Sequence, residues 1–114
     1  MSTRLKRNID YLKVLAKANK KQRKALVHTA DADLIICICE CVLNTLDGNV
    51  KLKPTCVKKL AHYKSALRQL ASRECSLHNR RNIIEQKGGF LPVLLTPILS
   101  IAGQLIADSI LRKK

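Results

Sequence analysis

Apolar positions recur every three or four residues along most of this chain, which is the spacing of one face of an α-helix. The first such stretch begins after Ser2 or Thr3, either of which can cap the N-terminus of a helix. Its apolar positions are Leu5, Ile9, Leu12, Leu15 and Ala16. A second, short helix is predicted over about Lys20–Val27.

The segment Leu34–Leu46 is apolar on almost every side, which is typical of a helix buried at the centre of a small protein. Asp31 and Asp33 place negative charge where this helix would begin, which suits its dipole. Gly48 can then take the left-handed conformation that closes a helix. The β-branched residues also permit a strand, but no other segment alternates cleanly enough to pair with it.

Two more helices are predicted before residue 88. Pro54 fits the first turn of a fourth helix, because no amide proton is needed there. The apolar side of this helix is expected at Val57, Leu60, Ala61, Leu67, Leu70 and Ala71, with the stem of Lys64 beside them. Ser76 is a candidate cap for a fifth helix that ends at Lys87, before Gly88-Gly89. We therefore predict an all-α bundle of four or five short helices over residues 3–87, followed by a separate segment, residues 88–114.

The last segment is mainly hydrophobic, and Asp108 is the one charged residue between Phe90 and Leu111. Roughly 20 apolar residues span a bilayer. Pro92 and Pro97 interrupt the first part, so a regular hydrophobic helix is predicted from near Pro97. Three roles are open: membrane insertion, docking on a partner or another copy, and completion of the helical core. The expected contact residues are Phe90, Leu91, Leu94, Leu95, Ile98, Ile101 and Leu105. Gly88 and Gly89 form a candidate hinge or processing site.

Charge changes this picture, because 22 Lys and Arg face 8 Asp and Glu in 114 residues, a net charge of +14. Solubility alone needs a net charge of roughly 2–8 in a small domain. Residues 28–50 contain no Lys or Arg, so the basic residues lie in the helices on either side. Such an excess predicts binding to a polyanion through phosphate contacts without sequence specificity. The candidate contacts are Lys20, Lys21, Arg23, Lys24, Lys58, Lys59, Arg80 and Arg81.

The chemistry of catalysis and metal binding has little support in this sequence. The five cysteines are an odd number, and three crowd into Cys37–Cys41, where buried reduced thiols are expected rather than a zinc site. No phosphate loop, nucleophile elbow or HExxH motif is present. We expect no enzyme activity, no cofactor and no metal. The charged start of the chain lacks the apolar core of a secretion signal, so the protein is not expected to be secreted.

The sequence from Arg80 to Leu95, RRNIIEQKGGFLPVLL, together with the general basicity, resembles small basic accessory proteins of adenovirus-like elements, including Polinton (Maverick) and adintovirus genomes. Some of these proteins carry a hydrophobic segment next to a Gly-Gly maturation site. Gln86 stands where that family's processing pattern has an apolar residue. The resemblance implies a virion or mobile-element protein that lies with the DNA, in the virion or in the host nucleus or cytoplasm.

Together, these patterns predict a non-enzymatic structural protein that binds nucleic-acid backbone, most readily DNA. The hydrophobic segment would engage a membrane or a capsid surface, or join copies of the chain into a homo-oligomer. The alternative is a membrane-associated or helical interaction protein whose positive charge meets anionic lipid or a partner.

Overall fold

The computed structural model describes residues 2–112, and the surroundings of side chains for residues 2–101. This part of the chain is all-helical, which confirms the predicted fold class. The elements are α1 (Thr3–Lys17), α2 (Lys20–Thr29), α3 (Ala32–Leu46), α4 (Pro54–Ala61), α5 (Lys64–Ala71), α6 (Leu77–Lys87), the 3₁₀ turn η1 (Gly88–Phe90) and α7 (Leu91–Arg112).

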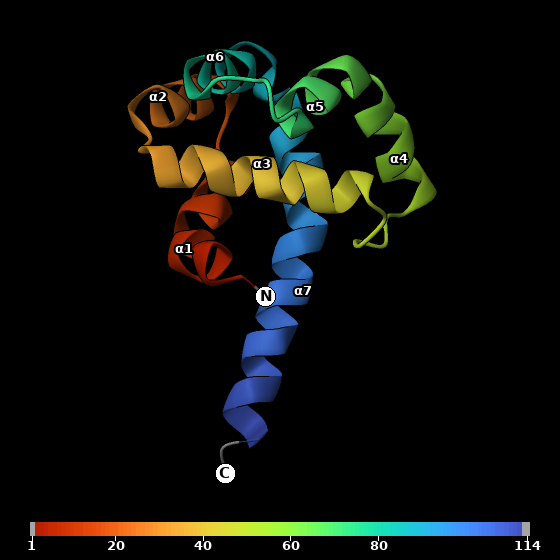
Figure 1. Ribbon diagram of the computed structural model, residues 1–114. Coiled ribbons are helices and arrows are strands. Elements are labelled where there is room, and N and C mark those ends of the chain that lie inside the picture. Colours follow the sequence, from red (N-terminus) through yellow and green to blue (C-terminus); the bar gives the residue numbers. More distant parts are fainter. Residues whose placement is uncertain (1, 113–114) are drawn as a thin grey trace.

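Helix α3 lies at the centre and packs against α1, α5, α6 and α7 (Figure 1). It begins at Ala32, two residues before the predicted segment, because the side chain of Asp31 caps it and accepts a hydrogen bond of 2.8 Å from the backbone N–H of Leu34. It ends before Gly48, whose φ of 78° confirms the predicted left-handed conformation. Ile35 and Ile38 have no exposed surface, so α3 is the buried central helix expected from its apolar pattern.

The helix ends follow local signals. Ser2, rather than Thr3, caps α1 and accepts a hydrogen bond from the N–H of Leu5. The cap at Ser76 and the position of Pro54 in the first turn of α4 are confirmed. Helix α2 continues two residues beyond the predicted end at Val27, to Thr29.

The predicted single helix over residues 54–71 is wrong, because the chain turns at His62 and Tyr63 and separates α4 from α5. The N–H of Tyr63 donates to the carbonyl of Leu60, three residues back, which tightens the last turn of α4. The ring of Tyr63 then packs edge-on against Phe90, with ring centroids 5.9 Å apart. As a result, the chain forms six α-helices between Thr3 and Lys87, not four or five.

The last helix begins at Leu91 rather than near Pro97. Pro92 lies in its first turn, where no backbone donor is required. Pro97 lies inside the helix, where a proline costs about 3 kcal/mol. Burial outweighs this cost, since Leu94 and Leu95 have no exposed surface and each fully buried leucine contributes about 1.5–3 kcal/mol.

The first part of α7 contributes to the same core as the preceding helices. Phe90 and Leu91 also have no exposed surface, and Ile98 is only 7% exposed. These five residues, Phe90, Leu91, Leu94, Leu95 and Ile98, thus fill the core in this structure, and their contact with a membrane or partner would require their removal from it. Over the residues described, no helix is both long and apolar enough to pass through a bilayer.

Candidate functional site

Helices α2 and α6 pack side by side and bring the basic residues of α2 next to the end of α6 (Figure 1). Asn19 caps α2 and forms a reciprocal capping box with Gln22, which satisfies the first backbone N–H groups. We call the basic residues in the first half of α2, together with Lys87 at the end of α6, the α2–α6 surface: Lys20, Lys21, Arg23, Lys24 and Lys87.

The first turn of α2 contains Lys20 and Lys21 and no acidic residue. Positive side chains there are unfavourable, because the N-terminus of a helix already carries about half a positive charge. The sequence thus departs from the usual helix pattern at an exposed position. Such departures are expected at functional sites, and here the helix dipole adds to the positive potential of the lysines.

A pocket of about 330 Å³ lies between the start of α2 and the end of α6. Three cationic residues of α2 and one of α6 surround it, and Tyr63 and the backbone of η1 contribute to its walls. The cationic residues are Lys20, Arg23, Lys24 and Lys87. Arg23 is held in place, since its guanidinium donates to the carbonyl of Ala18 at 3.0 Å. Glu85 also lines the pocket, but its carboxylate lies 3.0 Å from Nδ1 of His28.

Two acidic residues of α3, Asp33 and Glu40, are already engaged. Arg4 contacts Asp33 at 2.9 Å and Glu40 at 2.6 Å, and Arg7 contacts Asp33 at 2.9 Å. Hydrogen bonds from Arg7, Asn8 and Arg4 hold the pKa of the Asp33 carboxyl well below its ordinary value. Between described side chains, no lysine forms an ion pair with a carboxylate. The lysine ammonium groups therefore remain available to an external anion.

Arg80 and Arg81, which the sequence placed among the phosphate contacts, point to backbone carbonyls. Arg81 donates to Val27 at 2.9 Å and to Ala30, and so closes the C-terminus of α2. Arg80 donates to Ser72 at 2.9 Å, and its Nε is buried without a hydrogen-bond partner among the described residues. These contacts hold α6 to its neighbours, and no local pattern in the sequence indicates them.

The other predicted contacts lie apart from this surface. Lys58 and Lys59 are exposed on α4, at the opposite end of α3 from α2 (Figure 1). The eight predicted residues consequently do not form one patch. Lys87, which the sequence analysis left out, joins the α2 lysines only through the packing of α6 on α2.

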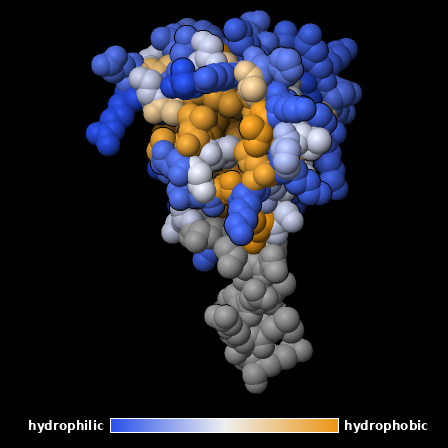
Figure 2. Space-filling view, turned by 90° about the vertical axis from the view of Figure 1, so that its right-hand side faces the viewer, coloured by the Kyte–Doolittle hydropathy of each residue, from blue (hydrophilic) through white to orange (hydrophobic). Residues whose placement is uncertain are grey.

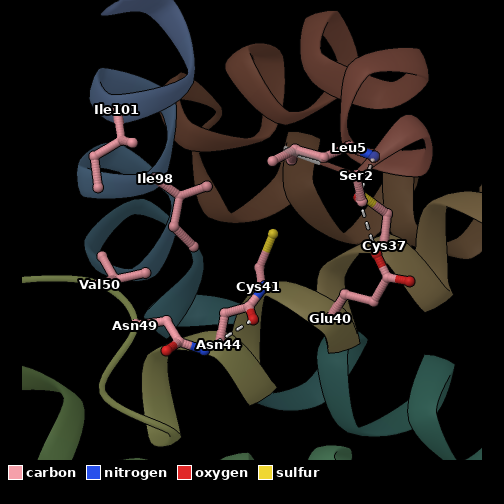
Figure 3. A pocket seen from close by; sticks show the side chains of 10 residues that line it. All are labelled: Ser2, Leu5, Cys37, Glu40, Cys41, Asn44, Asn49, Val50, Ile98 and Ile101. Atoms are coloured by element: carbon pink, nitrogen blue, oxygen red, sulfur yellow. Dashed lines mark hydrogen bonds between the residues drawn. The ribbon is translucent and has the colours of Figure 1, made fainter. Parts of the chain in front are cut away.

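The three clustered cysteines face the interior. Cys37 and Cys41 contribute to a pocket of about 260 Å³ between α1, α3 and α7 (Figure 3). The neighbouring thiol of Cys37 and burial raise the pKa of Cys41, and burial raises the pKa of Cys39 to about 11. Across the described residues, no three His, Cys, Asp or Glu side chains are grouped as metal ligands would be.

The remaining predicted residues lie in η1 and α7. Gly88 is buried and Gly89 is half-buried, in the 3₁₀ turn that joins α6 directly to α7. A Cβ atom added to Gly89 would lie 2.5 Å from the hydroxyl oxygen of Tyr63, so the chain passes very close to this ring. Ile101 is 42% exposed, and Leu105 lies outside the described side chains.

Comparison with known proteins found no matching family model, no similar curated protein and no similar solved structure.

Proposed function

We propose that this chain binds the phosphate backbone of nucleic acid without sequence specificity and without catalysing a reaction. The observation that carries this proposal is the group of cationic side chains on the α2–α6 surface, whose lysines lack carboxylate partners among the described residues. The distance of α4 from α2 makes the α2–α6 surface, rather than all eight predicted residues, the primary contact.

Several features support phosphate over a neutral ligand. The net charge is +14, and the lysines at the start of α2 add to the positive end of its dipole. Tyr63 is the only aromatic side chain lining the pocket, so stacking on several successive bases is not expected. Contacts to phosphates position a protein on nucleic acid without reading its sequence. We infer from the resemblance at Arg80–Leu95 that the nucleic acid is the DNA of a virion or a mobile element.

The test compares two variants that lose the same charge. One replaces Lys20, Lys21 and Lys24 of α2 by glutamine, and the other replaces Lys6, Lys13 and Lys17 of α1. Binding of full-length protein to a short duplex is measured across a salt series. Each lost phosphate contact lowers the slope of log affinity against log salt by about 0.9. We expect the slope to fall by about 2–3 in the α2 variant and by less than about 1 in the α1 variant.

Two outcomes would contradict the proposal. If the slope fell equally in both variants, binding would depend on the net charge of the protein and not on the α2–α6 surface. Affinity that does not change with salt would mean that phosphate contacts are absent. Anionic vesicles serve as competitor: if they displace the duplex at equal charge concentration, the surface binds lipid, and the alternative of a membrane-associated protein replaces this one.

A further inference from the structure

A groove of about 680 Å³ lies along α7, where this helix faces α4 and the loop between α3 and α4. Val93, Pro97 and Ile101 line it at four-residue spacing, which places them on one face of α7. Cys56 of α4 lies opposite. On this side of the molecule, Figure 2 shows apolar surface set in a hollow between hydrophilic side chains.

The opposite wall of the groove is cationic. Lys51 and Lys53 come from the loop before α4, and Lys59 from α4 itself. All three are exposed, and none forms an ion pair with a described carboxylate. An occupant that suits this groove therefore combines an apolar face with at least one carboxylate.

The second half of α7 has this composition. It extends beyond the other helices (Figure 1), and its sequence, residues 102–112, contains one acidic residue, Asp108, and one basic residue, Arg112 at its end, among mainly apolar and small residues. Its length also suits the groove. Residues 102–112 of a helix span about 16 Å, and residues 92–101, which line the groove, span about 15 Å.

The geometry points to a two-fold symmetric dimer in which each copy lays residues 102–112 in the groove of the other. Because the groove and the extending half are consecutive parts of one helix, antiparallel pairing of two α7 helices fills both grooves at once. The two-fold axis then lies close to Ile101, whose exposed side chain becomes buried. The turn that contains Asp108 lies beside residues 93–97 of the second copy and the lysine wall next to them. Such an interface uses the same surface on both copies and closes on itself.

The experiment measures the oligomeric state of the full-length protein, freed of nucleic acid, by analytical ultracentrifugation over a concentration series. Asp108→Lys replaces two symmetric attractions by two repulsions, and we expect it to raise the dimer dissociation constant at least about 10-fold. Asp10→Lys makes the same change of charge at an exposed position on α1 and should leave the dimer unchanged. Adding Lys59→Glu to Asp108→Lys should restore dimerisation.

The dimer would be refuted if the wild-type protein stayed monomeric at every concentration. It would also be refuted if Asp108→Lys and Asp10→Lys shifted the equilibrium equally, or if Lys59→Glu gave no recovery. Each of these results would leave the groove to another occupant, such as an acidic amphipathic peptide. Nucleic-acid binding is measured separately on the Asp108→Lys variant, so loss of the dimer and loss of the proposed function can be told apart.

Discussion

The contact between α1 and α3 and the α2–α6 surface both carry several basic side chains, but their charges are used differently. At the first, Arg4 and Arg7 meet the carboxylates of Asp33 and Glu40. At the second, Lys20 and its neighbours surround a pocket and have no carboxylate partner among the described residues. The number of basic residues in a segment therefore does not locate a binding surface. The more informative feature is a group of basic side chains that surround one pocket and lack internal partners.

Reversing the charge at the start of α2 should have the largest effect, because it weakens binding to the duplex and stabilises the fold at the same time. Lys20→Glu combined with Lys21→Glu is expected to weaken duplex binding roughly 100-fold, because two phosphate contacts become repulsive. The same change should stabilise the fold, since each acidic side chain in the first turn of a helix contributes about 0.3–1 kcal/mol. Fluorescence anisotropy with labelled duplex and urea unfolding measure the two effects.

Lys13→Glu combined with Lys17→Glu on α1 provides the matched control. It makes the same change in net charge outside the α2–α6 surface, so binding should fall much less. Undiminished binding by the α2 variant, or an equal fall in both, would remove the distinction between the two regions.

Arg81 tests the difference between basic residues with and without internal partners. It belongs to α6 but already donates to backbone carbonyls. Arg81→Met keeps the aliphatic stem and removes the bonds to Val27 and Ala30. The free energy of unfolding should fall by about 1.5–3 kcal/mol, the usual contribution of hydrogen bonds from charged groups. Arg73→Met removes an exposed arginine and should have little effect on stability. If the two variants unfold at the same urea concentration, Arg81 does not have the structural role assigned to it.

Local signals in the sequence predicted most helix ends and fewer of the contacts between helices. Ser76, Pro54 and Gly48 act on backbone within a few residues, so their effects were visible in the sequence. The break at Tyr63 was not, because it depends on packing against Phe90, far along the chain. The position of Pro97 inside a helix was not visible either, because it is compensated by neighbouring side chains that become buried only in the folded protein.

In the candidate site, too, local features could be predicted from the sequence and contacts between distant residues could not. The basic residues of α2 are adjacent in the sequence and could be selected from it, whereas Lys87 joins them only when α6 packs on α2. The partners of Arg4 and Arg7 lie 26 to 36 residues away, so no local pattern distinguishes these paired arginines from the unpaired lysines. Pairing is a property of the fold, and the function proposed for this chain depends on it.

The smallest expected effect is the loss of stability at the contact between α1 and α3 when the pH is lowered. The pKa of Asp33 is lower in the folded protein than its ordinary value of 3.8, through hydrogen bonds from Arg7, Asn8 and Arg4. The stability that this carboxylate contributes is therefore fully present above about pH 5 and is lost as the pH falls below about 4 toward its folded pKa. Asp33→Asn should lower the melting temperature at neutral pH and lose less stability than the wild type between about pH 5 and pH 2.

Thermal unfolding at several pH values tests this effect, with Asp10→Asn as the control on the exposed side of α1. If Asp33 and the two arginines stabilise the α1–α3 contact, the difference in melting temperature between wild type and Asp33→Asn narrows with acid, while Asp10→Asn follows the wild type throughout. A constant difference would mean that the carboxylate does not titrate with the fold. The arginines of α1 would then have to be regarded, like the lysines of α2, as open to an external anion.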